Sequence, residues 1–525
     1  MKLDFRTILP KNMLILLLIS MLVRGFFATW IALGNDEVYY WTYALFPDWS
    51  HFDHPPMVGW FIQLFSLNLL FDSELFIRMS SVIMMTVNTL LVFHIGKKIA
   101  GERTGFYAAL LYTASIYAFV ITGIFILPDT PQNFFWFLGL WSFLNAFSDS
   151  SDNTKNCWML LAGLFTGLGI LSKYTTVFLW FGAGLYILFY ARKWLKAWSL
   201  YVAVLLSFLL LFPVIWWNIQ NDFISFSFQG ERVNLLAGSL RPDLLLMELS
   251  GQILYNNPIN FVLIILGLIS AFRSKLMIKP DIQKLLLLMA VPLIGLFLFF
   301  SLFRSTLPHW TSPGYNTLLF FAAAWLATSK KISASILPKP IIAALGLLAV
   351  IIVVGSLQIK FGLIPFRDNN SFHQLGKNDV TLDMYGWRGL DKPFEEAITK
   401  HVQNQLMPEN APIISNNWFP LAHLDYYVAR PLQLKVLGIG KPEKLHKYLW
   451  INQERGGFDL GTDYWYMTNS RDYVDPLTIY EPYFREIIPA DTLTIMRAGK
   501  PAKHYFIFML KDLKKLPEQA LLDSQ

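Results

Sequence analysis

The chain has a single cysteine, Cys157, among its 525 residues, which excludes an internal disulfide framework and any zinc cluster built from cysteines. Charged residues are also scarce at 15%, whereas a soluble protein carries about 25%. No glycine-rich loop of the P-loop type is present, which argues against a pump driven by nucleotide hydrolysis. Hydrophobic residues make up 54% of the chain and aromatic residues 16%. This composition and the long apolar runs predict a polytopic α-helical membrane protein.

The N-terminus carries three basic residues and then an apolar run from Met13 to Leu33. A cleaved signal peptide is the alternative interpretation. The run, however, is about 20 residues long, enough to cross a bilayer, and no convincing cleavage site precedes Asn35. An uncleaved first span is therefore favoured.

Apolar runs of about 17–25 residues predict about eleven spans. Alternate loops between these runs hold most of the basic residues: Lys97, Lys98 and Arg103; Lys155; Arg192, Lys193 and Lys196; Arg273, Lys275, Lys279 and Lys284; and Lys330, Lys331 and Lys339. The other loops hold only Lys173, Arg232, Arg241 and Arg304. The positive-inside rule then places the N-terminus in the cytoplasm. The net charge of +7 is thus explained by topology, and no nucleic-acid partner is expected.

The composition changes near residue 358. We expect a transmembrane catalytic domain at 1–357, with a long outer loop at 34–74, and a soluble α/β domain at 358–525 on the outer side. Short alternating runs predict strands at 413–415, 433–437, 493–497 and 504–509, and helical patterns cover 395–405 and 441–452.

Unusual polar residues gather on the base-poor side. Asp36 and Glu37 follow the first span directly, and Asp129 lies in the next outer loop. A carboxylate at a helix end is most often just a solvated group. Here it shares a membrane face with the sparse cations Lys173 and Arg304. Such a set suits a reaction in which a carboxylate accepts a hydroxyl proton and a cation stabilises a departing phosphate.

His51, Asp53 and His54 have side chains that can bind a metal, but this spacing in a loop is a weak signal. A role in loop structure, with Pro55 and Pro56 setting an extended backbone, is the stronger interpretation. No metal ligand is assigned, and a divalent ion is left open as a cofactor.

Several spaced motifs resemble a known family. The string Asn-Asp-Glu-Val-Tyr-Tyr-Trp at 35–41, followed by Phe-Asp-His-Pro-Pro at 52–56, resembles the first outer loop of GT-C membrane glycosyltransferases. It is similar in particular to the bacterial branch of family 39, relatives of protein O-mannosyltransferases and of the lipid A aminoarabinose transferase. Later motifs of that branch follow in the same order: 128–131, 171–175, Phe228-Gln229 with Arg232, and 308–310. The resemblance covers roughly residues 10–330, and the C-terminal part is only loosely similar.

The resemblance implies a GT-C fold and an inverting transfer of a sugar from a polyprenyl-phosphate carrier to a lipid, glycan or protein hydroxyl. It implies a bacterial inner membrane protein, surrounded by membrane lipids, with an active site facing the periplasm. Asp36 would be the catalytic base, Glu37 would orient Asp36 or the acceptor, and Asp129 matches the second acidic motif. Further substrate contacts are expected from these residues: Lys173, Arg232 and Arg304 for the donor phosphate, and His309, Tyr39 and His54.

Two other functions fit the same composition. A transporter or flippase of lipid-linked sugars could use the same outer cations, but transporters commonly show repeats and broken spans, and no repeat is visible. A receptor or scaffold would leave the acidic loops unexplained.

Overall fold

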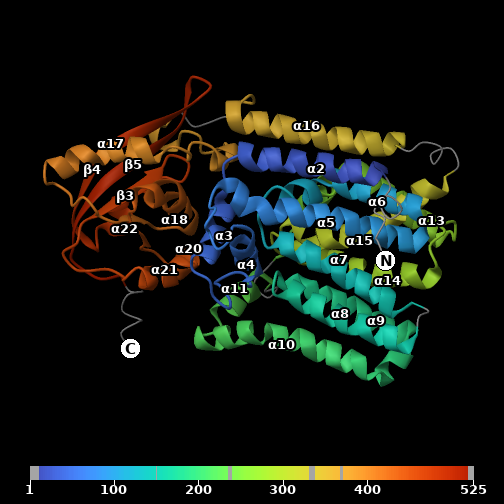
Figure 1. Cartoon of the computed structure of the whole chain (residues 1–525). Coiled ribbons are helices and arrows are strands. Elements are labelled where there is room, and N and C mark those ends of the chain that lie inside the picture. The colour runs from blue at the N-terminus through green and yellow to red at the C-terminus, as the bar shows by residue number, and fades with distance from the viewer. Residues whose placement is uncertain (1–10, 149–150, 234–238, 330–336, 367–370, 518–525) are drawn as a thin grey trace. The chain divides into compact units, whose positions relative to one another are not determined.

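The computed structural model describes residues 11–148, 151–233, 239–329, 337–366 and 371–517 (Figure 1). The chain forms two compact units. The first combines Met1–Thr29 with Pro47–Ile352, and the second combines Trp30–Phe46 with Val353–Gln525. Each unit is therefore built from two separate stretches of sequence.

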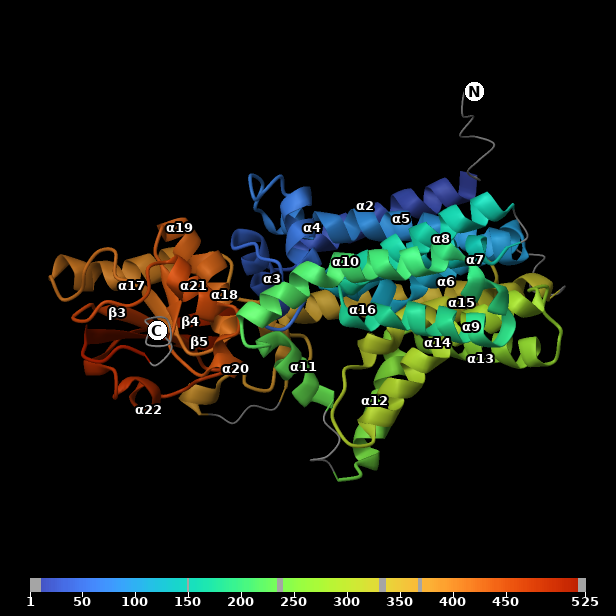
Figure 2. The ribbon, with the colours of Figure 1, turned by 90° about the horizontal axis from the view of Figure 1, so that it is seen from below.

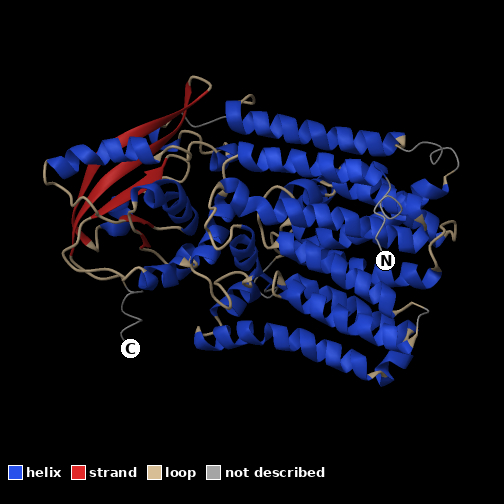
Figure 3. Ribbon diagram, viewed as in Figure 1, coloured by secondary structure: helices blue, strands red, loops and turns tan. Residues whose placement is uncertain are grey.

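The first unit is helical (Figure 3). Its helices are α2 (Lys11–Trp30), α4 (Met57–Phe65), α5 (Glu74–Ala100), α6 (Glu102–Ala114), α7 (Asp129–Ala146), α8 (Asp152–Ile170), α9 (Val177–Tyr190), α10 (Trp198–Gln220), α11 (Ile224–Val233), α12 (Pro242–Tyr255), α13 (Pro258–Phe272), α14 (Pro280–Ser301), α15 (Ser312–Thr328) and α16 (Lys339–Phe361), the first and last of which end in the second unit. The two views of Figures 1 and 2 show α8 running beside α7 and α10.

Five of the described helices, α2, α5, α10, α14 and α16, are long and apolar enough to cross a membrane. The pair α12 and α13 would make a sixth span, bent by 96°. These findings support a polytopic membrane protein. The expected number of about eleven spans stays a prediction, because the other helices are shorter or less apolar.

Small residues let neighbouring helices approach closely. A Cβ added at Gly163 of α8 would lie 2.4 Å from the carbonyl oxygen of Ala203 in α10. One turn on, a Cβ at Gly167 would lie 2.9 Å from the Cα of Ser207. The Ser207 hydroxyl donates to the Gly163 carbonyl at 2.5 Å. This is the spacing of small residues by which helices associate in lipid, where van der Waals packing replaces the hydrophobic effect.

Two buried arginines lie within the spans. Arg78 of α5 donates to the carbonyl of Ala28, near the end of α2, at 2.9 Å. The Arg24 guanidinium lies 4.6 Å from the ring centroid of Phe119. Periodicity could not predict these partners. The Arg78 hydrogen bond and the Arg24–Phe119 contact lower the cost of burying the two charges, although the Arg24 nitrogens have no hydrogen-bond partner among the described residues.

The second unit contains a five-stranded sheet of order β2-β1-β3-β5-β4. Its strands are β1 (Ile413–Ser415), β2 (Val436–Gly438), β3 (Tyr464–Asn469), β4 (Phe484–Arg497) and β5 (Lys500–Leu513). β1 pairs in parallel with β2 and β3, whereas β5 is antiparallel to both β3 and β4. The helices of this unit are α3 (Asn35–Leu45), α17 (Asp391–Gln403), α18 (Trp418–Leu424), α19 (Arg430–Leu432), α20 (Pro442–Leu445), α21 (Tyr448–Glu454) and α22 (Pro476–Tyr480).

Helix α3 packs against α18 in this second unit. The backbone N–H of Leu33 donates to the Tyr427 hydroxyl at 2.8 Å, and Trp41 contacts Tyr426 edge to face at 5.2 Å. The first part of the loop at 34–74 thus belongs to the fold of the C-terminal residues, although it follows the first span in sequence.

Candidate active site

An ion pair forms the centre of a polar cluster in the first unit. Asp129 is the first residue of α7, and Lys173 lies in the extended turn after α8. The Lys173 Nζ is 2.8 Å from the Asp129 Oδ2, and the two side chains are 8% and 4% exposed. The Tyr117 hydroxyl donates to the other carboxylate oxygen at 3.2 Å. Two motifs that are 44 residues apart in sequence therefore meet in one buried contact.

The Lys173 ammonium keeps the Asp129 carboxylate ionised. Burial alone would raise the pKa of Asp129, but the charge of Lys173 and its hydrogen bond outweigh burial and leave this pKa below its ordinary value. An ionised, paired carboxylate is a weak proton acceptor. Its geometry suits it to hold the Lys173 ammonium in place.

His54 lies in the turn before α4 and is largely buried, with 15% of its side chain exposed. Burial lowers the pKa of His54 to about 4, Asp53 and Asp129 oppose this shift, and Lys173 and Arg232 reinforce it. The imidazole is therefore neutral at physiological pH. Gln229 of α11 holds this turn by donating its amide to the Asp53 carbonyl.

His309 lies in the 3₁₀ turn Pro308–Thr311, which precedes α15. Burial lowers the pKa of His309 to about 4, with Asp129 opposing the shift. Its ring packs 5.7 Å from that of Tyr255. The neighbouring Trp310 ring lies 5.9 Å from the Lys173 Nζ. This turn therefore covers the ion pair with one neutral imidazole and one aromatic face.

Arg232 and Arg304 lie at the edge of this cluster. Arg232 is exposed on α11, and its guanidinium lies 4.4 Å from the Phe228 ring centroid. Arg304 is half-buried and donates to the Glu231 carbonyl. Within the first unit, the structure thus brings together four of the predicted residues: Asp129, Lys173, His54 and His309. Arg232 is close enough for its charge to help lower the pKa of His54.

The other predicted residues lie in the second unit. Asp36 is exposed in the first turn of α3. Glu37 is buried, and its Oε2 accepts the backbone N–H of Gly34 at 2.9 Å. A glutamate at this position that reaches back to the N-cap backbone forms one half of a capping box, because the N-cap Gly34 has no side chain to form the other half. Through this hydrogen bond, Glu37 stabilises the start of α3, where Asp36 lies.

Asn35, immediately before Asp36, forms hydrogen bonds with two residues from the C-terminal stretch of the second unit. The His423 Nε2 and the Asn35 Oδ1 are 2.9 Å apart, and Asp383 also hydrogen-bonds the Asn35 side chain. The His423 ring stacks on Trp387 at 4.2 Å with an interplanar angle of 3°. Sequence reasoning missed His423 and Asp383, and no local pattern marks them, because their role depends on contacts with a residue far away in sequence, 388 positions in the case of His423.

A buried lysine supports the same region. Lys503 donates to the Leu382 carbonyl at 3.1 Å and lies 4.5 Å from the Trp387 ring centroid. Burial lowers the pKa of Lys503 well below its ordinary value, Arg471 adds to this effect, and Asp383 opposes it. This network fixes the turn that carries Asp383 beneath the start of α3.

Tyr39 is buried in an aromatic cluster of the second unit. Its ring lies 4.9 Å from Trp418 and 5.7 Å from His446. This packing is that of a core residue, and substrate contact by Tyr39 stays a prediction. Among the residues that the structure describes, no group of three or more His, Cys, Asp or Glu side chains is arranged to hold a metal ion.

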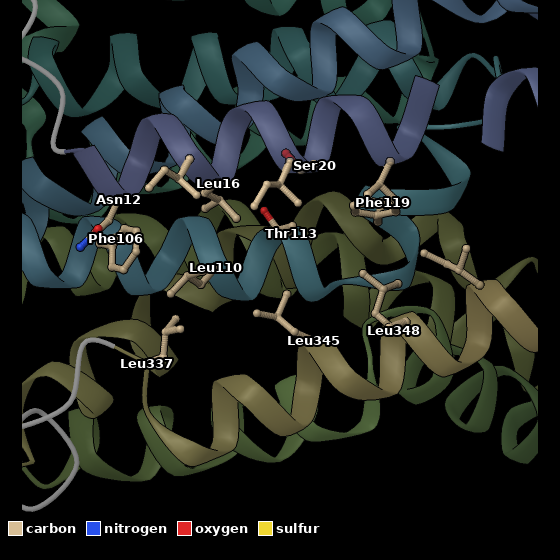
Figure 4. Close-up of a pocket in the computed structure, with 15 residues that line it drawn as sticks. Asn12, Leu16, Ser20, Phe106, Leu110, Thr113, Phe119, Leu337, Leu345 and Leu348 are labelled. Carbon is tan, nitrogen blue, oxygen red and sulfur yellow. The ribbon is translucent and has the colours of Figure 1, made fainter. Parts of the chain in front are cut away.

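An apolar cavity of about 430 Å³ lies between α2, α6 and α16 in the first unit (Figure 4). Leu16, Leu110, Leu345 and Leu348 project into it from three different helices. Ser20 and Thr113 are among its few polar lining groups. A cavity with such walls can accommodate a hydrocarbon chain.

Comparisons with known proteins bear on the fold and the family that the chain resembles. The profile of the family described as dolichyl-phosphate-mannose-protein mannosyltransferase matches residues 53–217. The lipid A galacturonosyltransferase RgtD of Rhizobium johnstonii is 20% identical over 293 residues, which are 55% of this chain and 60% of that relative. The match thus spans less than two thirds of RgtD.

Two crystal structures of ArnT from Cupriavidus metallidurans share the fold. The apo structure matches with a TM-score of 0.62 at 15% identity, over 94% of this chain and 98% of ArnT. The structure of ArnT bound to undecaprenyl phosphate matches with a TM-score of 0.60 at 16% identity, over 95% and 98%. The resemblance to GT-C membrane glycosyltransferases is therefore confirmed, and the chain has the fold of that class over nearly its whole length.

Proposed function

We propose that this chain is an inverting glycosyltransferase that moves a sugar from a polyprenyl-phosphate carrier to an acceptor hydroxyl. The observation that carries the proposal is Asp36, an exposed carboxylate on a helix start that is fixed by Glu37 and His423. Such fixation suits a general base, whose efficiency depends on its position relative to the proton that it accepts.

In the proposed step, the Asp36 carboxylate takes the proton of the acceptor hydroxyl while that oxygen attacks the anomeric carbon. A new carbon–oxygen bond forms on one face as the bond to the carrier phosphate breaks on the other. The polyprenyl phosphate leaves with the electron pair, and the anomeric configuration inverts. No further co-reactant is required, because the phosphate is already an activated leaving group.

Lys173 is the cation that we assign to the departing phosphate. Its pairing with Asp129 and its buried position hold the ammonium in a region of reduced solvent, where charge stabilisation is most effective. Arg232 and Arg304 would add phosphate contacts from the α11 side. His54 and His309, both neutral, would donate or accept hydrogen bonds to the donor without adding charge.

The related proteins support the substrate class. One ArnT structure contains undecaprenyl phosphate, and RgtD is named for lipid A. These names support a polyprenyl-phosphate donor and a lipid acceptor as our proposal for this chain, and the apolar cavity between α2, α6 and α16 suits a lipid-linked substrate. A glycan or protein acceptor has no such support. The activities named among these relatives are sugar transfers, and none is the transport expected of a flippase.

We also propose that the protein lies in a bacterial inner membrane with its active site facing the periplasm. The basic loops support a cytoplasmic N-terminus. Eleven of the described helices would cross the membrane: α2, α5, α6, α7 from Pro131 onward, α8, α9, α10, α13, α14, α15 and α16. With this odd number of spans, the domain at 358–525 would lie in the periplasm.

The test is transfer of labelled sugar from a polyprenyl-phosphate donor to an extracted lipid fraction. Purified wild type is compared with Asp36→Asn and with a matched control, Asp459→Asn, at another exposed aspartate of the second unit. Loss of a general base should slow transfer by about 10²–10⁴-fold, while donor binding persists and the control stays active. Full activity of Asp36→Asn would refute the role of Asp36, and donor binding without any transfer by wild type would favour the flippase.

A further inference from the structure

Helix α12 packs against the turn Pro308–Thr311 and lies at the edge of the helical first unit (Figure 2). Three large apolar side chains on its outer face are more than half exposed: Leu246, Met247 and Leu254. Glu248 and Gln252 lie together on the opposite face, because residues four apart are neighbours on a helix, and they are only 1% and 0% exposed. Burial of apolar surface does not orient a helix whose packed face is polar. Its polar contacts therefore decide how α12 sits on the protein.

The polar face of α12 holds the segment around this turn at two points. The Thr306 hydroxyl donates to the Glu248 Oε2 at 2.8 Å. The Tyr315 hydroxyl donates to the Gln252 Oε1 at 2.8 Å. The Gln252 amide in turn donates to the Glu248 Oε1 at 2.8 Å, so both carboxylate oxygens serve as acceptors. Because Thr306 precedes the turn and Tyr315 follows it, the turn is fixed at both ends by two linked side chains of α12.

Gly251 lets α12 approach the turn closely. It lies between Glu248 and Gln252 in sequence and on the same side of the helix. A Cβ added at Gly251 would lie 2.7 Å from the Cβ of Pro308, which is closer than such atoms approach one another, so Pro308 would have to move. Pro308 stands directly before His309. A side chain at position 251 would therefore displace the turn that carries His309.

The residues that this turn carries lie beside the buried ion pair. The Trp310 ring lies 5.9 Å from the Lys173 Nζ and packs on the ring of Phe297 in α14 at 5.3 Å. His309 is close enough to Asp129 for the carboxylate to oppose the lowering of the His309 pKa by burial. The contacts of α12 thus determine where one imidazole and one indole lie relative to the Lys173 ammonium.

We propose that Glu248, Gly251 and Gln252 are positioning residues, which hold His309 and Trp310 in place to bind the phosphate of a polyprenyl-phosphate donor at Lys173. This inference rests on the proposed function. The three residues act through the turn, and none of them needs to touch the donor. A turn that contacts the donor equally in the ground state and in the transition state contributes to binding, so its displacement raises KM and leaves kcat nearly unchanged.

The experiment compares Gly251→Ala with a matched control, Gly295→Ala, in the purified full-length protein. Both glycines lie within helices, α12 and α14, where alanine is favoured over glycine. A Cβ at Gly295, however, meets no neighbouring segment within 4 Å in the described part of the chain. Binding of undecaprenyl phosphate is measured together with the kcat and KM of sugar transfer. Gly251→Ala should weaken binding and raise KM about tenfold, since a misplacement of about 1 Å can cost about 100-fold, and Gly295→Ala should match wild type.

A second variant, Thr306→Val, keeps the shape of threonine and removes only the hydroxyl that donates to Glu248. It should weaken binding of undecaprenyl phosphate about threefold. Amide hydrogen exchange at 306–311 follows the turn itself and does not depend on sugar transfer. Exchange there should be faster in Thr306→Val and Gly251→Ala than in wild type and Gly295→Ala.

Three results would overturn the proposal while leaving an active wild type as evidence for the proposed function. The first is donor binding by Gly251→Ala and Thr306→Val that equals that of wild type. The second is exchange at 306–311 that is unchanged in both variants. The third is a fall in kcat with KM unchanged, as expected when only the fraction of folded protein decreases. A wild type that binds no undecaprenyl phosphate would instead refute the proposed function, and this inference with it.

Discussion

Replacement of Lys173 by methionine would remove the cation from a pair that lies almost out of contact with solvent. The carboxylate of Asp129 would keep the Tyr117 hydroxyl as a hydrogen-bond donor, but it would lose the ammonium at 2.8 Å. Methionine preserves the length and the apolar stem of lysine. The variant therefore tests the charge and not the packing.

The expected loss is large, because the side chains of Lys173 and Asp129 are only 8% and 4% exposed. Removal of one partner from a buried ion pair typically costs about 3–5 kcal/mol, since it leaves an uncompensated buried charge. Asp129→Asn should cost a similar amount for the same reason. The double variant Asp129→Asn/Lys173→Met leaves neither charge, so it should be more stable than the sum of the single losses by about 2–3 kcal/mol.

The free energy of unfolding can be followed by tryptophan fluorescence during denaturant titration in mixed micelles. Lys284→Met provides the control, because the Lys284–Asp281 pair has a similar distance of 3.0 Å but side chains that are 40% and 73% exposed. That exposed pair should contribute less than about 1 kcal/mol. Equal small losses for Lys173→Met and Lys284→Met, or strict additivity of the two buried changes, would refute the assignment of a buried, coupled pair.

Three further predictions concern other parts of the chain. Burial lowers the pKa of His54 from its ordinary 6.5 to about 4. Between these two pH values the imidazole is protonated in the unfolded chain and neutral in the folded chain. His54 should therefore account for a loss of up to about 3 kcal/mol of stability as pH falls from 6.5 to 4, and unfolding of His54→Gln should depend less on pH than unfolding of wild type. His423→Phe keeps a ring on Trp387 but removes the bond to Asn35, and should cost about 1 kcal/mol and lower kcat for sugar transfer with KM unchanged; an unchanged kcat would contradict a positioning role. Gly163→Val should destabilise the chain by about 1–3 kcal/mol, measured by the same unfolding assay, because α8 has no room for a side chain there.

Part of the C-terminal fold was predictable from local patterns. The strand at 413–415 is confirmed as β1, and the predicted strands at 493–497 and 504–509 lie within the longer hairpin of β4 and β5. β3, at 464–469, was missed because all of its residues are buried. A strand that is covered on both faces has no alternation of polar and apolar residues to detect. The helix expected at 441–452 is divided into α20 and α21, because His446 between them has a φ of 51°.

The sequence by itself determined the membrane class, the order of the motifs and the types of residue that we propose for the chemistry. These features follow from composition and from neighbours along the chain, as do the apolar runs of α2 and α16. Only the tertiary structure decided that Lys173 pairs with Asp129 and that His423 holds the residue before Asp36. Both contacts join segments that are far apart in sequence, and their geometry depends on how the helices pack. No periodicity within one segment contains that information.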